Sequence, residues 1–599
     1  MRCFLVDHDG KTLTSHYLPV NVLHPKAGHA EMDPEEFWLG FKDLVTQTIS
    51  RAGLDVKDAK CLGITCQRNT FLLWHRETGR PLCNMITWQD RRASQTCKDW
   101  NASLQFKFLH TGASLLHFVT GSKRFLAASI LLLITQQVAP RLYWALNNYP
   151  NALDLALAGK VCFGTIDTWL LWKLTGGKVH ATDYSNISTS ALFDPYQMQY
   201  SDLVLSTLGI PASILPNVKD TGGLFGHTDE DIFGAEIPIT AIVSDQTSAM
   251  FAQGCWSPGD VKCTLGTGMF LSFNTGRKAH ASLTGFYPEI GWKIGEELVY
   301  LAEANFPSCG SVIQWGLNFG LYSDPSQTAG IAEMVESSDG LCFVPAFDGI
   351  QVPHNDPTAA AGMIGLTHNT RKEHMVRALL ESIAYNFKQV FEAGKSELNL
   401  EVNRIRVDGG VCNNDFVMQL TSNIIGHTIE RPAESDITVY GAVFIAGLAC
   451  GFWESKDEIK RFWKLDRTFD PVVDASGKGV MLDRWQYGCC VLIIVGLMLE
   501  VVVQTMLEVV VLAILEVVLA ILEVVVVAIL EVVALAILGG GHSGGSGADH
   551  AGGSGADHAG GSGADHAGGG GGGSARITIS YCTRVGFVQG VVIGRRKCH

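Results

Sequence analysis

The sequence lacks the features that identify several large classes of protein. Only 17% of its 599 residues are charged, and no run of Lys and Arg is longer than residues 595–597. Acidic residues outnumber basic ones by 59 to 45, which gives a formal net charge of −14. A chain with this acidic balance and no basic patch has little to attract a phosphodiester backbone, so nucleic acid is not expected as a partner.

Targeting and disulfide signals are also missing. The first ten residues, MRCFLVDHDG, contain neither the apolar core of a signal peptide nor the Arg- and Ser-rich composition of a transit peptide. The 16 cysteines are scattered along the chain without a CxxC pair. The sequence therefore predicts reduced thiols and a cytoplasmic location.

What is present divides the chain into five segments. The length is too great for one ordinary domain, and the composition is mixed and aperiodic up to Tyr487. An apolar repeat follows, and then a tract that contains GGSGADHA three times. The expected organisation is an N-terminal lobe at 1–238, a C-terminal lobe at 239–487, an apolar low-complexity repeat at 488–538, a Gly-rich linker at 539–574 and a basic tail at 575–599.

The apolar repeat raises the question of a membrane. From Val491 to Leu538, 40 of 48 residues are apolar, and a helix needs about 20 residues to cross a bilayer. Five glutamates interrupt this stretch, and each costs roughly 2.5–3.5 kcal/mol at the centre of a span. Membrane association is therefore an interpretation that rests on the tail alone, and translated simple-sequence DNA is the other interpretation.

The first 487 residues alternate short β-rich runs with amphipathic stretches. Strands are expected at residues 61–65, 239–245, 262–268 and 403–410, and helices at 34–52, 167–174, 374–393 and 414–425. Strands that alternate with helices are typical of α/β layers. Two such sets, on either side of about residue 238, predict two similar lobes with a cleft between them.

Three of these strands end in turns of small and polar residues. Asp245 and Gln246 follow the first, Gly266-Thr267-Gly268 follow the second, and Asp408-Gly409-Gly410 follow the third. Glycine turns let backbone N–H groups approach a phosphate, and a helix N-terminus adds further donors. A tight hairpin turn and an ordinary strand-to-helix turn remain the alternatives for the second and third.

The sequence around these turns resembles the FGGY carbohydrate kinases, and among them the glycerol kinases. The stretches that carry the resemblance are FGTIDTWLLWKLTGGKVHATDYSNIS (163–188), AIVSDQTSAMFAQG (241–254), VPAFDGIQVPHNDP (344–357), LLESIAYN (379–386) and RVDGGVCNNDFVMQ (406–419). The resemblance implies an α/β fold of two actin-like, ribonuclease-H-like lobes around an inter-lobe cleft. It further implies a homo-oligomer that uses ATP and Mg²⁺ to phosphorylate glycerol or a related small polyol.

The resemblance also implies roles for individual residues. Asp245 takes the position of the catalytic base, which accepts a proton from the substrate hydroxyl. Substrate contacts are expected from Arg68, Trp88, Asp245 and Gln246. Nucleotide contacts are expected from Gly266, Thr267, Gly268, Gly310, Gln314, Gly410 and Asn414. No residue is assigned as a metal ligand.

Two departures from the family pattern bear on function. Asn69 stands where glycerol kinases have a Glu that accepts hydrogen bonds from the substrate, so the identity of the polyol stays open. Family members also have a strand and a phosphate-binding DxGT/S-type turn before the point at which Met1 aligns, and the N-terminal lobe is expected to lack both. The alternative function is therefore a catalytically impaired FGGY protein with a nucleotide-binding or regulatory role.

Overall fold

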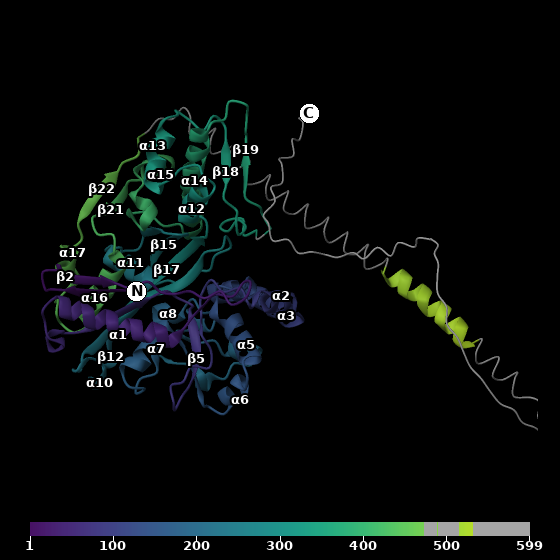
Figure 1. Ribbon diagram of the computed structural model, residues 1–599, viewed down its shortest axis with the longest axis horizontal. Coiled ribbons are helices and arrows are strands. Elements are labelled where there is room, and N and C mark those ends of the chain that lie inside the picture. Colours follow the sequence, from purple (N-terminus) through teal and green to yellow (C-terminus); the bar gives the residue numbers. More distant parts are fainter. Residues whose placement is uncertain (357, 473–484, 486–487, 489–513, 531–599) are drawn as a thin grey trace, which may run out of the picture. The chain divides into compact units, whose positions relative to one another are not determined.

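The computed structural model describes residues 1–356, 358–472, 485, 488 and 514–530. The chain forms two compact units, residues 1–511 and 512–599. The first unit is built from α/β layers (Figure 1) and contains all the residues that the sequence analysis assigns to a site.

The first lobe contains several small sheets. An antiparallel hairpin joins β1 (Arg2–Val6) to β2 (Thr12–Tyr17). A three-stranded sheet has the order β12 (Gly222–His227), β13 (Pro238–Ser244), β4 (Leu62–Cys66), and a four-stranded sheet has the order β3 (Glu31–Met32), β6 (Met85–Ile86), β5 (Phe71–His75), β7 (Val161–Thr165). The remaining pairs are β8 (Ala181–Asp183) with β11 (Asn217–Lys219), and β9 (Phe193–Asp194) with β10 (Gln199–Tyr200).

The second lobe is organised around one seven-stranded sheet. Its order is β16 (Tyr287–Ile294), β17 (Glu297–Phe306), β15 (Met269–Gly276), β14 (Asp260–Leu265), β20 (Arg404–Asp408), β21 (Ile429–Pro432), β22 (Leu465–Phe469). A separate hairpin pairs β18 (Cys342–Val344) with β19 (Gly362–Ile364). Strands β14, β20 and β21 run parallel and the others antiparallel, so the carboxyl ends of β14 and β20 meet at one edge.

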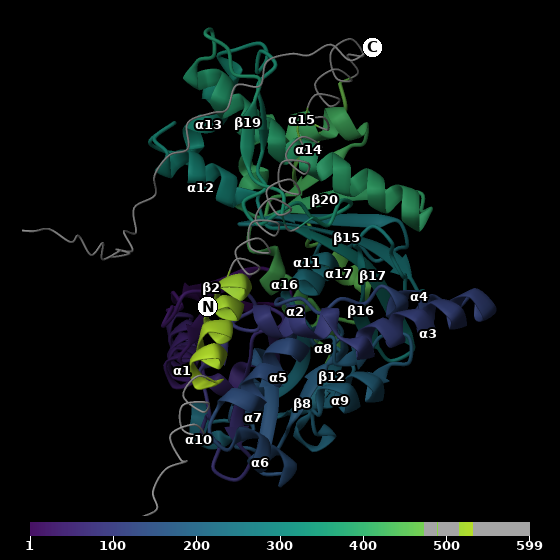
Figure 2. The same ribbon diagram turned by 90° about the vertical axis from the view of Figure 1, so that its right-hand side faces the viewer.

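Helices cover these sheets. In the first lobe they are α1 (Pro34–Arg51), α2 (Ser94–Ala102), α3 (Leu104–Thr120), α4 (Lys123–Ser129), α5 (Val138–Asn148), α6 (Ala152–Leu157), α7 (Ile166–Leu174), α8 (Tyr184–Ile187), α9 (Asp202–Leu208) and α10 (Glu230–Phe233). In the second they are α11 (Asp245–Ala252), α12 (Gly310–Asn318), α13 (Thr328–Glu333), α14 (Lys372–Leu398), α15 (Asp415–Ile425), α16 (Ile437–Ala449) and α17 (Lys456–Lys460). Figure 2 shows α12, α14 and α15 on one side of the large sheet and α11 and α16 on the other.

The strands and helices expected from the sequence are present. The four strands are β4, β13, β14 and β20, and the four helices are α1, α7, α14 and α15. Helix α1 begins where its sequence dictates, because Pro34 fixes the first helical φ and the Asp33 carboxylate accepts from the backbone N–H of Glu35 at 2.8 Å. Helix α14 extends beyond the expected residues 374–393 at both ends.

Buried side chains explain how the two lobes are joined. One apolar core lies under β5, β7, α5 and α7, and a second lies between α14, α15 and strands β14, β15 and β20. A third core packs α11 and α16 against β13, together with Trp292 and Trp453. Strand β13 also pairs with β4 and therefore lies in a sheet of the first lobe. In sequence, β13 starts at the expected boundary between the lobes, residue 238. That boundary stays a prediction.

The apolar repeat lies largely outside the described residues. The part that the structure describes, residues 514–530, is helical, and its side chains are exposed. None of the helices within the described parts of the chain is both long and apolar enough to cross a bilayer.

Candidate functional site

Asp245 lies at the junction of β13 and α11. The strand ends at Ser244 and the helix begins at Asp245, whose carboxylate accepts from the backbone N–H of Gln246 at 2.8 Å. In the parallel β13–β4 ladder, Ser244 is paired with Cys66. The loop that follows β4 therefore leaves the sheet at the same edge as Asp245, and this loop carries Arg68.

Arg68 joins this loop to the second lobe. Its guanidinium donates from Nη1 to Glu289 on β16 and from Nη2 to Glu303 on β17. All three side chains are buried. Glu303 also accepts from Tyr287 at 2.6 Å and from Ser272 at 2.9 Å. The Arg68 guanidinium thus supplies one positive charge to two buried carboxyl groups.

The protonation of Asp245 is set by opposing effects. Burial raises the pKa of the Asp245 carboxyl above its ordinary value, and the positive charges of Arg68 and Lys262 oppose that rise. Lys262, on β14, donates from Nζ to the Gln246 side-chain oxygen at 2.6 Å. Arg68, Asp245 and Gln246 are therefore brought together as predicted, and Lys262 joins them.

Trp88 and Asn69 lie beside this group. The backbone N–H of Trp88 donates to Thr70 at 3.1 Å, two residues after Arg68. Asn69 has a φ of 61°, a left-handed conformation that asparagine tolerates, and its side-chain oxygen accepts from Thr189 at 3.2 Å. The Asn69 side chain, which stands where glycerol kinases have a Glu, thus already accepts a hydrogen bond from within the protein.

The glycine turns of the second lobe contact one another. Gly310, at the start of α12, donates its backbone N–H to Gly266 at 2.9 Å, and the N–H of Ser311 donates to Thr267 at 3.1 Å. A Cβ on Gly310 would lie 2.6 Å from the Gly266 oxygen, and a Cβ on Gly268 would lie 2.8 Å from the Phe306 oxygen. A side chain at Gly310 or at Gly268 would therefore clash with neighbouring backbone, so both positions require glycine.

The Asp408-Gly409-Gly410 turn lies against the same surface. Thr264 donates to the Asp408 carboxylate at 2.5 Å, which ties β20 to β14. Gly409 has a φ of 89°, and a Cβ there would lie 2.6 Å from the Leu265 oxygen. A Cβ on Gly410, in contrast, would meet nothing within 4 Å. The open space beside Gly410 leaves room for part of a nucleotide.

The last two expected nucleotide contacts lie on helices nearby. Asn414 caps α15 by accepting from the N–H of Val417 at 3.1 Å, and its amide donates to Thr328 at 3.0 Å. Gln314 lies on α12, one turn after Gly310, and donates to Asn318 at 3.0 Å. Asn414 thus has a structural role in this state, whereas Gln314 is held only by its own helix.

Three residues of this site escaped the sequence reasoning. Glu289, Glu303 and Lys262 all lie inside strands, and of these three strands only that of Lys262 is expected from the sequence. The available signal was a charged residue in an otherwise apolar strand, as in YLAEANF (300–306). Among the residues that the structure describes, no three His, Cys, Asp or Glu side chains gather as a metal site.

Comparison with known proteins gives a consistent picture. Residues 1–252 match the profile of the FGGY family of carbohydrate kinases, N-terminal domain, and residues 261–450 match that of the C-terminal domain. Glycerol kinase 5 of Danio rerio is 47% identical over 471 residues, which cover 79% of this chain and 89% of the relative. Glycerol kinase 2 of Thermotoga maritima is 36% identical over 489 residues, 81% of this chain and 95% of the relative.

A solved structure supports the same relationship. The crystal structure of Plasmodium falciparum glycerol kinase with ADP superimposes with a TM-score of 0.73 at 30% sequence identity, over 81% of this chain and 95% of that chain. The predicted two-lobed α/β fold is therefore confirmed.

Proposed function

The chain belongs to the FGGY family of carbohydrate kinases and is an ATP-dependent kinase of that family, and we propose that its substrate is glycerol or a related small polyol. The observation that supports this most is the position of Asp245 at the carboxyl end of β13, beside Arg68 and Lys262. The catalytically impaired alternative has no support from the relatives, which are kinases by name.

Asp245 accepts the proton of the attacking hydroxyl in this proposal. Phosphoryl transfer needs alignment and charge neutralisation, because its transition state involves little covalent chemistry with the protein. Burial raises the pKa of the Asp245 carboxyl, and the positive charges of Arg68 and Lys262 oppose that rise and so favour the ionised form. Gln246, which accepts a hydrogen bond from Lys262, and Trp88 orient the polyol in this proposal.

The nucleotide is held by backbone rather than by charged side chains. We assign the phosphates to the turn formed by Gly266, Thr267 and Gly268, which the N–H of Gly266 closes by donating to the Gly268 oxygen at 2.9 Å. We assign the adenosine to Gly310, Gln314, Gly410 and Asn414. Bound ATP supplies the phosphoryl group that is transferred. Mg²⁺ is part of the same proposal, and it commonly binds through nucleotide phosphates and water with few protein ligands. A cytoplasmic location and a homo-oligomer remain predictions from the sequence.

The proposal is tested with purified full-length protein, ATP, Mg²⁺ and a panel of polyols from glycerol to xylitol. We expect ATP-dependent formation of a phosphate ester from at least one of them. Asp245→Asn should lower kcat by about 10²–10⁴-fold, the usual contribution of a general base, and leave ATP-analogue binding unchanged. Asp202→Asn, an exposed residue in the first turn of α9, is the matched control. A folded protein that phosphorylates none of the panel would contradict the substrate class.

A further inference from the structure

Helix α3 carries an apolar stripe on its exposed side. Five side chains that are between 64% and 87% exposed form this stripe: Leu104, Phe108, Leu115, Phe118 and Val119. Their spacings of three, four and seven residues place them on one face of a helix with 3.6 residues per turn. Phe106 and Ala113 lie on the opposite face and are buried. The helix therefore packs on the first lobe by one side and presents these five residues, the α3 stripe, on the other.

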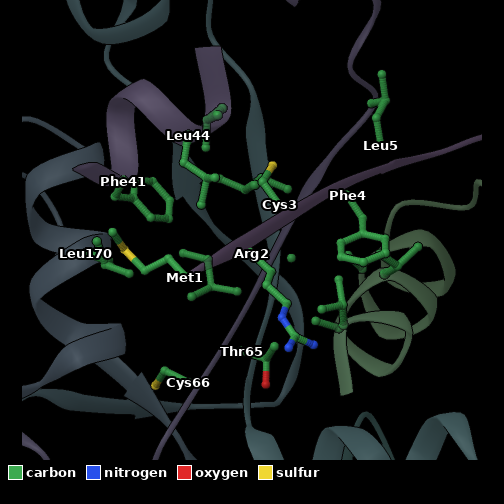
Figure 3. Close-up of a pocket in the computed structure, with 18 of the residues that line it drawn as sticks. Met1, Arg2, Cys3, Phe4, Leu5, Phe41, Leu44, Thr65, Cys66 and Leu170 are labelled. Atoms are coloured by element: carbon green, nitrogen blue, oxygen red, sulfur yellow. The ribbon is translucent and has the colours of Figure 1, made fainter. Parts of the chain in front are cut away.

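Apolar side chains elsewhere in the first lobe are covered. Figure 3 shows Met1, Phe41, Leu44 and Leu170 grouped around a cavity of about 640 Å³, and all four are buried or half-buried. Their apolar surface faces other parts of the same lobe. The α3 stripe faces outward instead, and large apolar side chains that gather on one exposed face mark an interaction site.

The stripe lies on a projecting hairpin. Helix α3 ends before Gly121, which has a φ of 66°, and α4 begins two residues later at Lys123. The two helices contact each other, and Figure 2 shows them extending together beyond the neighbouring helices of the first lobe. The start of α4 is held in place, because Arg124 Nε donates to the Asp194 carboxylate at 2.6 Å. The α3 stripe is thus fixed in position and can meet a surface from outside.

The charge of this region is opposite in sign to that of the whole chain. Residues 100–153 contain no Asp or Glu, although the chain has a net charge of −14. Lys107, at the margin of the stripe, and Lys123, at the start of α4, are exposed. Asp194 and Glu397 also lie in this region, but their side chains are only 11% and 15% exposed. The α3 stripe is therefore flanked by positive charge.

A basic turn of the second lobe lies next to α4. Arg277 and Lys278 are exposed and directly follow β15. Two residues later, the backbone oxygen of His280 accepts from the Tyr196 hydroxyl at 3.0 Å. Burial and, to a smaller extent, the charge of Lys123 lower the pKa of His280, so Lys123 lies near this turn. Lys123, Arg277 and Lys278 therefore belong to one basic region at the turn of the hairpin.

An anionic lipid surface matches both the apolar stripe and its charge. In helices that lie at a membrane interface, Leu and Phe enter the acyl boundary by about 5–10 Å while Lys and Arg stay among the headgroups. A second copy of the hairpin would bring like charges together. A partner helix usually fixes its register through flanking charges of both signs, whereas α3 and α4 carry one sign, which a laterally uniform anionic surface accommodates. Since α3 packs on protein by its opposite side, it lies in the plane of such an interface.

We propose that the α3–α4 hairpin docks on an anionic lipid bilayer, with the α3 stripe inserted at the acyl boundary and Lys107, Lys123 and the turn at 277–278 among the headgroups. The contact belongs to the first compact unit, so it is separate from any contact that the apolar repeat makes. It does not rest on the proposed kinase reaction, because none of these residues belongs to the assigned substrate or nucleotide site.

The test compares two pairs of substitutions in the full-length protein. Leu104→Ser with Leu115→Ser changes the α3 stripe, and Leu157→Ser with Leu224→Ser is the matched control, because all four leucines are more than half exposed. Flotation measures binding to vesicles of phosphatidylcholine alone and of phosphatidylcholine with about 30% phosphatidylserine. We expect the unaltered protein and the control pair to bind the anionic vesicles, and the stripe pair to bind them at least about tenfold more weakly. The apolar repeat is present in every protein, so it cannot account for this difference.

Substitution of single lysines tests the electrostatic part. Lys107→Gln should weaken binding to the anionic vesicles about fivefold, and Lys160→Gln, at an exposed lysine outside this region, should leave it unchanged. Melting temperatures show whether each variant is folded. If the stripe pair does not fold, the two lysine variants decide, because neither side chain is buried.

Three results with vesicles would each overturn the proposal: absence of binding to the anionic vesicles, equal binding to both kinds of vesicle, or equal binding by the two leucine pairs. A protein that binds no vesicles but self-associates in sedimentation velocity, and becomes monomeric only in the stripe pair, would show that the α3 stripe covers a second copy of the chain. That result would overturn lipid docking as well. Phosphorylation of soluble polyols is measured without vesicles, so failure of the proposed reaction leaves the docking result unaffected.

Discussion

A single guanidinium, that of Arg68, holds two glutamates of the other lobe. Replacing Arg68 by Met would leave Glu289 and Glu303 buried without a counter-charge, so we expect a loss of about 3–5 kcal/mol in the free energy of unfolding. Arg68→Lys keeps the charge but cannot contact both carboxylates in the same way, and a smaller loss is expected. Urea unfolding of the three proteins measures this, and a Met variant as stable as the parent would show that the pair contributes nothing.

The pKa of Asp245 should govern the pH dependence of the reaction. The base must be ionised, so kcat should rise with pH through a pKa that burial has moved above the ordinary Asp value of about 3.9. Lys262 favours the ionised form, so Lys262→Met should raise that pKa further and move the rise in kcat to higher pH. Profiles of kcat against pH for the two proteins check the sign, and coincident profiles would remove Lys262 from the electrostatics of the site.

The residues that sequence reasoning found and missed differ in a physical way. Asp245 and the glycine turns follow strands, and strand ends are readable from local sequence. Arg68 and its partners Glu289 and Glu303 are 221 and 235 residues apart in sequence, and no local pattern indicates that they meet. Their contact depends on how the two lobes pack, which only the folded chain reveals.

At the scale of elements, the two glycines of the turn between β20 and α15 are expected to differ in role: Gly409 in stability and Gly410 in nucleotide binding. Gly409 has a φ of 89° and no room for a Cβ, so Gly409→Ala should destabilise the protein by about 1–2 kcal/mol or more through backbone strain. Gly410 has open space, so Gly410→Ala should leave stability unchanged and weaken ATP-analogue binding by about tenfold or more, since a methyl group would occupy the nucleotide's space. Calorimetry of both variants measures melting and affinity, and unaltered affinity of the Gly410 variant would move the nucleotide elsewhere.

The expected elements were correct because each had a local cause. Helix α1 has Pro34 and the Asp33 cap, and strand β13 is a buried apolar run that ends in Ser. Strand β20, RIRVD, alternates Arg with buried Ile and Val and ends in Asp. The expected range of α14 was too short at both ends: the helix is closed at its carboxyl end by Asn399, which has a φ of 49°, and its middle packs on α15 and β15 within the second core.

At the scale of the whole molecule, Trp485 packs near the end of the second lobe. Its indole is buried against Tyr385, and its Nε1 donates to Phe343 at 3.1 Å. A chain that ends at Tyr487 keeps this contact, whereas one that ends at residue 484 loses it. Removal of a buried tryptophan costs about 3–5 kcal/mol, so the shorter chain should melt at a clearly lower temperature.

Beyond this point the composition predicts an effect on solubility. The apolar side chains of the helix at 514–530 are exposed, and the five glutamates of the repeat have a mean spacing of 31/4 = 7.75 residues, against roughly 7.2 for two helical turns. The acidic side chains therefore drift around a helix and define no polar face, and exposed apolar surface of this extent promotes aggregation or membrane association. We expect the chain that ends at Tyr487 to be more soluble than the full chain and to bind nucleotide equally well. Sedimentation of both proteins measures this, and a full chain that is equally soluble and monomeric would mean that the repeat is covered by other parts of the protein.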